Sequence, residues 1–174
     1  MSPFVLSQVL VAIAICTDLL SFQFKNRRQI LCCLIISSIL IAVHFMLLAH
    51  WTAAGLGVLA GLRFFVGYWT TSKKMMGLFL TCSLGVGVFT YGGPLSLLCT
   101  CGALCNTVGS FAGEDRRMRQ WMFLGTGCWL SHNLLAGSPT AVLLETIFLA
   151  SNLVGYYRYY LRPSLGTCPT SPVN

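Results

Sequence analysis

Several ionisable side chains lie inside long apolar stretches of the sequence, where a charge could bind a solute or carry a proton, and four of them form two candidate pairs. They are Asp18, Arg63, His132 and Glu145. A charged side chain in the hydrocarbon of a bilayer costs about 2.5–3.5 kcal/mol on insertion scales. Each of these residues must therefore face protein or water, which makes it a candidate for binding, proton transfer or structural pairing.

Asp18 and Arg63 form the first candidate pair. Counted along a helix at 1.5 Å per residue, both lie roughly 18–21 Å from the same end of their apolar stretches. Residues at one level can meet, so the sequence predicts an ion pair between them. Such a pair acts either as structural glue or as part of a ligand site, and both interpretations stay open.

His132 and Glu145 form the second candidate pair, because they are equally distant from the turn at Ser138-Pro139. Two antiparallel helices joined there would hold them at one level, ~9–10 Å from the outer surface. A carboxylate beside a histidine favours the charged imidazolium and could load a proton. The same two residues could equally form a hydrogen-bonded clamp between helices.

The elements that must position these residues are apolar segments. The chain has 174 residues, of which 56% are hydrophobic and 9% are charged, and its mean hydropathy is +0.76. A soluble domain carries about 25% charged residues, so this composition is typical of a helical membrane protein that crosses the bilayer several times. The net charge of +7 does not indicate nucleic-acid binding, because the basic residues fall in short gaps between apolar segments.

Seven apolar segments are predicted to be transmembrane helices. They cover residues 3–23, 29–49, 52–71, 75–90, 95–112, 120–136 and 140–161. Basic residues occur in alternate gaps, which by the positive-inside rule places those gaps in the cytoplasm and the N-terminus outside. The tail at 162–174 is rich in Pro, Ser and Thr and is expected to be disordered and cytoplasmic.

The first three segments resemble the last three when the chain is shifted by 88 residues. In this register His44 meets His132, Thr52 meets Thr140, and 66–68 (Val-Gly-Tyr) meets 154–156 (Val-Gly-Tyr). We therefore predict two parallel three-helix repeats, 1–71 and 92–161, joined by a linker helix at 72–91. Parallel repeats occur in transporters with the site between the halves. The alternative is a duplication that only builds a stable bundle.

At several positions that are 88 residues apart, the two predicted repeats carry residues of different types. Asp18 corresponds to Asn106 and Asn152 to Phe64, whereas Glu145 has no acidic counterpart. An asparagine facing an aromatic ring suits a small polar ligand with an apolar face, although simple helix packing would also explain it. The substrate-binding candidates are Asn152, Phe64, Asp18, Arg63 and Asn106, and the candidates for proton transfer or gating are Glu145, His132 and His44.

Metal, cofactor and enzyme chemistry are not expected. Most of the nine cysteines lie in apolar segments, where they act as packing residues. Cys99, Cys101 and Cys105 could be taken for metal ligands, but a zinc site needs paired spacings and a fourth ligand. The sequence contains no recognisable set of nucleophile, base and oxyanion donors and no phosphate loop.

One motif carries a likeness to known proteins: Trp129-x-x-His132-Asn133-x-x-x-Gly137-Ser138, followed by Glu145, Asn152 and Arg158. Together with Arg27-Arg28 and Val43-His44-Phe45 in the first half, it resembles the YgjV family of bacterial inner membrane proteins over residues 4–162. This resemblance implies a topology and an inner-membrane location, but no substrate. The layout is more distantly similar to the SWEET sugar transporters and the PnuC vitamin-precursor transporters, although the intramembrane prolines of SWEET proteins are absent.

From these patterns we predict an all-α inner-membrane transporter that moves a small polar solute by alternating access between two three-helix bundles. The alternative is a multi-pass scaffold or partner subunit that transports nothing. The expected partners are the lipid bilayer and the solute, with no nucleic acid, and self-association stays open. A polar cavity between the halves would favour transport, whereas a dry, packed interface would favour a scaffold.

Overall fold

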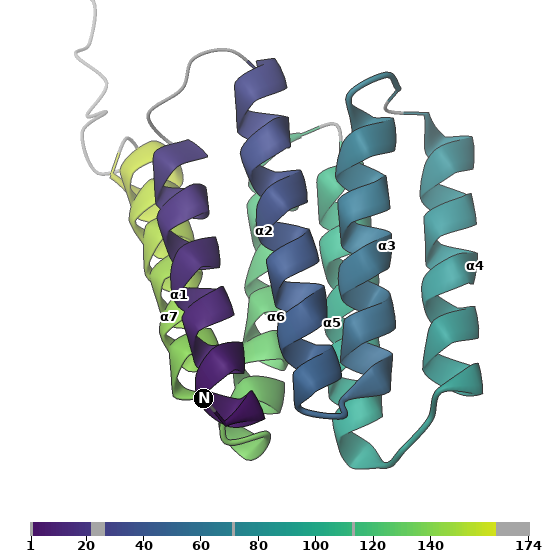
Figure 1. The fold of residues 1–174 in the computed structure, drawn as a ribbon. Helices are drawn as coiled ribbons and strands as arrows, with labels where there is room; N and C mark the ends of the chain where they lie inside the picture. The colour runs from purple at the N-terminus through teal and green to yellow at the C-terminus, as the bar shows by residue number, and fades with distance from the viewer. Residues whose placement is uncertain (1, 22–26, 71, 113, 163–174) are drawn as a thin grey trace, which may run out of the picture.

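The computed structural model describes residues 2–21, 27–70, 72–112 and 114–162, and this part of the chain forms a bundle of seven α-helices (Figure 1). Each helix runs antiparallel to the one before it. The seven predicted helices are confirmed, whereas most of the tail predicted at 162–174 lies outside the described residues. The helices are α1 Pro3–Ser21, α2 Arg27–Leu47, α3 Trp51–Gly67, α4 Lys73–Phe89, α5 Pro94–Ser110, α6 Asp115–Leu135 and α7 Pro139–Tyr156, and a π-helical turn, Tyr157–Leu161, follows α7.

The helix starts follow from local sequence. Pro3, Pro94 and Pro139 each stand at the first helical position, where the N–H that proline lacks would have no partner inside the helix. Ser72 caps α4 by accepting a hydrogen bond of 3.2 Å from the backbone N–H of Lys74. Because of this cap, α4 begins two residues before the predicted segment.

The start of α6 differs from the prediction. Residues 114–119 carry several charges and were predicted to be a loop before a helix starting at 120, but α6 already begins at Asp115. The exposed Glu114 and Arg117 form an ion pair of 3.2 Å across this first turn. Acidic groups at a helix N-terminus also interact favourably with the helix dipole. The charged run is therefore helical, and it brings Arg119 onto the same helix as His132.

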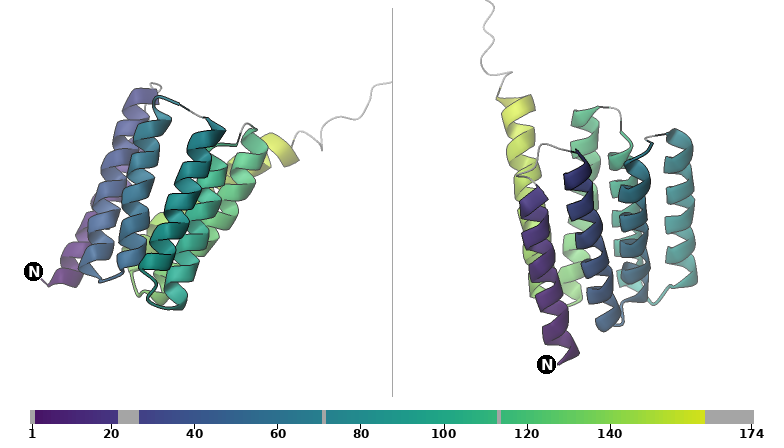
Figure 2. Two further views of the ribbon diagram at one scale, coloured as in Figure 1. Left: turned by 90° about the vertical axis from the view of Figure 1, so that its right-hand side faces the viewer. Right: turned by 45° about the horizontal axis from the view of Figure 1, so that its top comes forward.

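Six of the helices form a closed ring, and α4 lies outside it. The first trio, α1 to α3, packs in sequence order, as does the second trio, α5 to α7. The ring closes where α3 meets α5 and where α1 meets α7, while α4 covers the α3–α5 junction (Figure 2). The interior of the ring is thus bounded by both trios.

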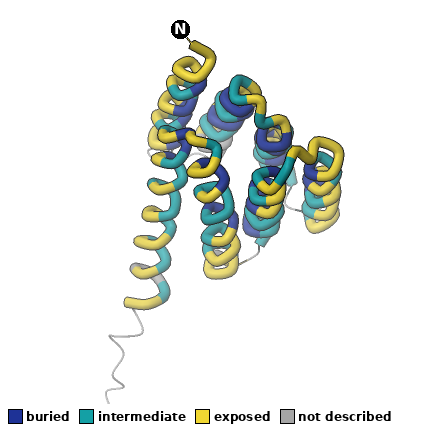
Figure 3. Tube along the Cα trace, turned by 90° about the horizontal axis from the view of Figure 1, so that it is seen from below, coloured by how far each residue is buried: buried dark blue, intermediate teal, exposed yellow. Residues whose placement is uncertain are grey.

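The outer faces of the bundle are apolar and exposed, whereas buried residues face the interior (Figure 3). Small residues such as Ala14, Ala42 and Ala53 are almost fully buried and let the helices approach closely. Two stretches, Pro3–Leu20 and Pro139–Tyr156, are long and apolar enough to cross a membrane, with mean hydropathies of 2.0 and 1.2. Cys32–Leu47 and Trp51–Gly67 are shorter apolar helices.

Candidate binding cavity

A cavity of about 420 Å³ lies inside the ring, and all seven helices contribute to its lining. This volume falls in the range of about 300–1,000 Å³ that is usual for small-molecule sites. Its aromatic walls are Phe45, Phe64, Phe79, Trp129 and Phe148. Its charged and amide side chains are Asp18, Arg63, Asn106, Arg119, Asn133, Glu145 and Asn152.

The two ends of the cavity differ in exposure. We define the lower end of the bundle as the end where α1, α3, α5 and α7 begin, and the upper end as the end where they finish, as drawn in Figure 1. Toward the lower end, Phe45, Asn133 and Ala141 are 1%, 2% and 3% exposed. Toward the upper end, Arg119 and Asn152 are only half-buried. The cavity is therefore closed below and more accessible from above.

Arg63 places a buried guanidinium on the α3 wall of the cavity. The residue is 9% exposed, and its Nη1 donates a hydrogen bond of 2.8 Å to the Thr107 hydroxyl on α5. The guanidinium carbon lies 5.3 Å from the centre of the Phe64 ring, which adds a cation–π attraction. The buried Nε has no hydrogen-bond partner among the described residues, and none of their carboxylates forms an ion pair with this arginine.

Asp18 does not pair with Arg63, so that prediction was wrong. Its Oδ2 instead accepts a hydrogen bond of 2.8 Å from the Ser37 hydroxyl on α2. The prediction matched the depths of the two residues along their helices, but depth does not fix the direction in which a side chain points. Arg63 points to the second trio, whereas Asp18 is held within the first.

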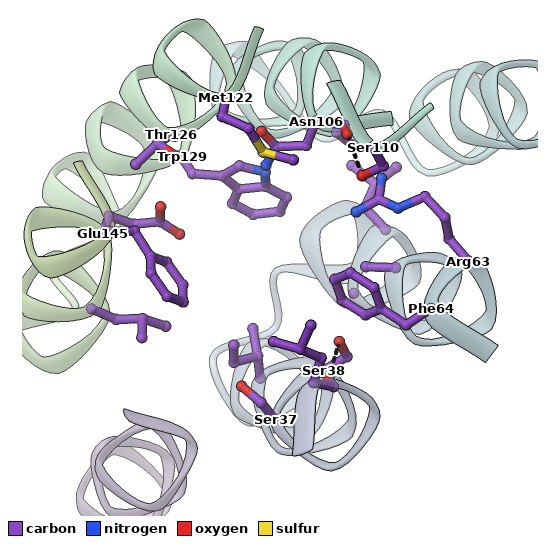
Figure 4. Close-up of a pocket in the computed structure, with 18 of the residues that line it drawn as sticks. Ser37, Ser38, Arg63, Phe64, Asn106, Ser110, Met122, Thr126, Trp129 and Glu145 are labelled. Carbon is purple, nitrogen blue, oxygen red and sulfur yellow. Dashed lines mark hydrogen bonds between the residues drawn. The ribbon is translucent and has the colours of Figure 1, made fainter. Parts of the chain in front are cut away.

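Glu145 projects from α7 into the cavity, across from Arg63 (Figure 4). It is half-buried, and its carboxylate forms no hydrogen bond or ion pair with any other described residue. The predicted contact with His132 is not formed. A carboxyl inside a cavity that has no partner among the described residues is available to a ligand.

Arg119 and Asn152 join α6 to α7 near the upper end. The Asn152 amide donates a hydrogen bond of 2.9 Å to the Arg119 carbonyl oxygen, and Arg119 Nη1 donates one of 3.4 Å to Asn152 Oδ1. Asn152 therefore lines the cavity as predicted, but both of its polar atoms already have partners. It stays a candidate for ligand contact with part of its bonding capacity used.

Asn106 reaches the cavity from α5, next to a glycine of α6. Its buried Oδ1 has no hydrogen-bond partner within the described part of the chain. A Cβ at Gly125 would collide with this oxygen, so the glycine leaves the space that the amide occupies. Asn106 thus adds a free acceptor to the lining.

The two predicted gating histidines lie below the cavity and do not line it. His44 and His132 are 0% and 1% exposed. His44 Nδ1 lies 3.0 Å from the Ser7 carbonyl oxygen and Nε2 lies 3.3 Å from the Ser138 hydroxyl. His132 Nδ1 lies 3.2 Å from Asn133 Oδ1. The rings of His132 and His50 meet edge to face, with their centres 5.4 Å apart. At this end burial lowers the pKa of His50, which lies between α2 and α3, below its usual value.

Gln8 completes the closure of the lower end. Its Oε1 accepts hydrogen bonds from the Thr140 backbone N–H at 3.2 Å and from the Thr140 hydroxyl at 2.5 Å. It also lies 3.4 Å from the Ser138 hydroxyl. These bonds tie α1 to the start of α7, so the two trios are joined directly below the cavity.

Six of the eight predicted site residues line one cavity: Asp18, Phe64, Arg63, Asn106, Glu145 and Asn152. Their functional roles stay predictions. Sequence analysis missed Thr107, the partner of Arg63, and it placed Arg119 in a loop. The only available signal for Thr107 was a hydroxyl in an apolar segment, which is common in membrane helices. The described residues contain no group of three His, Cys, Asp or Glu side chains arranged to hold a metal ion.

Comparison with known proteins matches nearly the whole chain. The family profile Imp-YgjV, described as bacterial inner membrane protein, matches residues 5–163. The inner membrane protein YgjV of Escherichia coli strain K12 is 28% identical over 169 residues, which cover 97% of this chain and 92% of that protein. No solved structure gives a significant match.

Proposed function

Because this chain belongs to the Imp-YgjV family of bacterial inner membrane proteins, we propose that it carries a small polar solute across the inner membrane. The solute binds in the central cavity, and the two trios move against each other to open it first to one side and then to the other. The observation that carries this proposal is a cavity lined by charged side chains, of which Arg63 has one neutral hydroxyl partner and Glu145 has none among the described residues.

The charges in the cavity favour a carrier over a scaffold. A bundle that serves only as a scaffold would gain stability by pairing Arg63 and Glu145 or by replacing them with apolar residues. Ionisable residues retained inside membrane segments usually mark a solute or proton path. Here Arg63 has one neutral hydroxyl partner, and Glu145 has none among the described residues.

The helix bounds support the proposal of two parallel repeats. α2 is Arg27–Leu47 and α6 is Asp115–Leu135, so both ends differ by 88 residues. α3 begins at Trp51 and α7 at Pro139, again 88 residues apart. This is the shift that aligns the sequence with itself. In transporters built from parallel repeats the site lies between the halves, which is where this cavity lies.

Charge distribution supports an orientation. Lys73 and Lys74 begin α4, and Arg116 and Arg117 lie in the first turn of α6, all at the upper end. By the positive-inside rule this end faces the cytoplasm, and the N-terminus, at the lower end, faces outward. In this orientation the cavity is accessible from the cytoplasm, and the bonds of Gln8 and His44 close its outer side.

Uptake by the purified full chain in liposomes tests the proposal. Liposomes with and without the protein are incubated with pooled small polar metabolites, and their contents are identified by mass spectrometry. We expect at least one solute to accumulate only with the protein, and accumulation to be lost in Glu145→Gln but kept in Glu114→Gln. Retention of every solute outside would favour the scaffold.

A further inference from the structure

We infer that the cavity takes a small zwitterion whose positive and negative groups are separated by an apolar spacer. This inference rests on the proposed function and specifies its solute. It starts from the opposed placement of Arg63 on α3 and Glu145 on α7, with the cavity between them (Figure 4).

The cation side of the site has unused hydrogen-bonding capacity. Within the described residues, the one hydrogen bond of the Arg63 guanidinium runs from Nη1 to Thr107, and the buried Nε has no partner. A guanidinium presents five N–H donors in a planar fork that matches a carboxylate. The cavity wall beside it is uncharged, with Asn106 and Ser110 from α5. An anionic group of the ligand would find its counterion here.

The Glu145 side of the cavity has unused hydrogen-bond acceptors. The Glu145 carboxylate has no hydrogen-bond donor among the described residues. Asp18, which also lines the cavity, accepts a hydrogen bond from the Ser37 hydroxyl. A ligand ammonium can donate three hydrogen bonds to such oxygens. It would also separate two carboxyl groups that otherwise repel each other.

The balance of charge selects the class of ligand. A neutral sugar would leave both Arg63 and Glu145 without a counterion in a low-dielectric site. A simple anion would satisfy Arg63 only, and a simple cation would satisfy Glu145 only. A zwitterion neutralises both charges and adds no net charge to the interior.

The spacing and the walls select its shape. The two charged groups lie on opposite walls (Figure 4), so we expect a ligand with separated charges to reach both and a ligand with adjacent charges, such as an α-amino acid, to reach one of them at a time. Phe148 and Trp129 add apolar surface to the cavity lining. A volume of about 420 Å³ corresponds to roughly fourteen waters at ~30 Å³ each. An ω-amino acid or a small dipeptide fits these limits.

The test is binding to the full chain in detergent, followed by thermal unfolding. The probes are ω-amino acids with four to eight carbons as well as glycyl-phenylalanine. Each ω-amino acid is matched with the alkylamine and the alkyl carboxylate of the same length, and glycine serves as the adjacent-charge control. We expect at least one separated-charge zwitterion to raise Tm and to bind about tenfold or more tightly than either singly charged analogue.

Charge-removing variants assign the two ends. In Glu145→Gln the zwitterion should lose about tenfold or more in affinity, while the alkyl carboxylate binds as before. Arg63→Gln should weaken binding of the zwitterion and of the alkyl carboxylate, while the alkylamine binds as before. If Arg63→Gln folds poorly, Arg63→Lys replaces it in the test. Because Arg63→Lys keeps the positive charge, it should retain part of the affinity. The matched controls, Glu114→Gln and Arg117→Gln, remove an exposed ion pair whose residues do not line the cavity.

Three results would overturn the inference. The first is that a neutral, singly charged or adjacent-charge probe binds most tightly, and the second is that Glu145→Gln binds the zwitterion with unchanged affinity. The third is that no zwitterion shifts the Tm of protein that unfolds cooperatively. Failure of the inference and failure of transport are distinguishable. Liposome uptake of a sugar or a simple anion would keep transport and reject the zwitterion. Zwitterion binding without uptake would reject transport and keep the ligand class.

Discussion

The Nη1 of Arg63 donates a hydrogen bond of 2.8 Å to the hydroxyl of Thr107. This bond joins α3 to α5 and therefore crosses from the first trio to the second. The Gln8–Thr140 bonds cross between the trios on the other side of the ring, from α1 to α7. Arg63, which lines the cavity, thus bonds across the α3–α5 junction, and Gln8 bonds across the α1–α7 junction. In the proposed carrier, a ligand bound at Arg63 would act directly on an interface between the two trios.

Thr107→Val should destabilise the protein by about 1–2 kcal/mol, because it removes the acceptor of a buried guanidinium at nearly constant volume. Thermal unfolding in detergent measures the change. Thr146→Val is the matched control, since the Thr146 hydroxyl is exposed and bonds only within α7. Equal Tm values for the two variants would show that the Arg63–Thr107 bond does not hold the α3–α5 junction.

Gly125→Ala should destabilise the protein by about 1–3 kcal/mol, because the new methyl group would collide with Asn106 Oδ1 between α5 and α6. Gly127→Ala, two residues away, meets nothing within 4 Å and should be neutral or stabilising by up to about 1 kcal/mol. Unfolding of the two variants in the same detergent measures the difference. A Gly125→Ala protein as stable as Gly127→Ala would contradict the packing of Asn106 against α6.

Gln8→Leu should loosen the lower end, because it removes the acceptor of the Thr140 N–H and of the Thr140 hydroxyl. Hydrogen–deuterium exchange measured by mass spectrometry should become faster in the peptide that contains the start of α7, with the turn between α2 and α3 unchanged. Gln120→Leu, an exposed position at the upper end, serves as the control. Unchanged exchange at Thr140 in Gln8→Leu would show that this link does not close the cavity.

The stability of the wild-type protein should depend on pH through His50. Burial lowers the pKa of this residue below 6.5, so the native state binds a proton less readily than the unfolded chain does. The resulting contribution is fully present above about pH 6.5 and is lost as the pH falls through the native pKa. Between about pH 7 and pH 5, Tm should therefore fall more steeply in the wild type than in His50→Gln. His44 and His132 are common to both proteins. Parallel Tm curves would therefore contradict a half-buried His50 that is neutral in the native state.

Sequence reasoning predicted the seven helices, because long apolar runs separated by charged gaps allow few alternatives. It also singled out Asp18, Arg63 and Glu145, since a charge in an apolar run is expensive unless it faces protein or a cavity. The cavity that gathers all three is consistent with that reasoning. Its volume and its closure at one end depend on helix packing, which composition does not encode.

The predicted pairings failed for a physical reason. Residue counts along a helix give depth at 1.5 Å per residue, but they do not give the rotation of the helix or the identity of its neighbour. Arg63 has Asp18 near its depth, yet α3 turns that face to α5, where Thr107 lies. Glu145 and His132 are at similar distances from their turn, but His132 faces Asn133 and His50 below the cavity.

Charge patterning also misplaced the start of α6. The run from Glu114 to Arg119 contains five charged residues. Because the helices were predicted from apolar segments, this charged run was assigned to a solvated loop. In the structure the run is the first turn of a helix that extends beyond its apolar part. Arg119 could be recognised as part of the cavity lining only after the helix had been extended to include it.

Solute counterflow in proteoliposomes tests the central claim most directly. Vesicles loaded with the zwitterion that binds best are diluted into its labelled form, and label uptake is compared among the wild type, Arg63→Lys, Glu145→Gln and the exposed control Glu114→Gln. We predict rapid uptake by the wild type and Glu114→Gln, slower uptake by Arg63→Lys, and a loss of at least about tenfold in Glu145→Gln. Counterflow by Glu145→Gln at the wild-type rate, or no counterflow by correctly folded wild-type protein, would contradict the account.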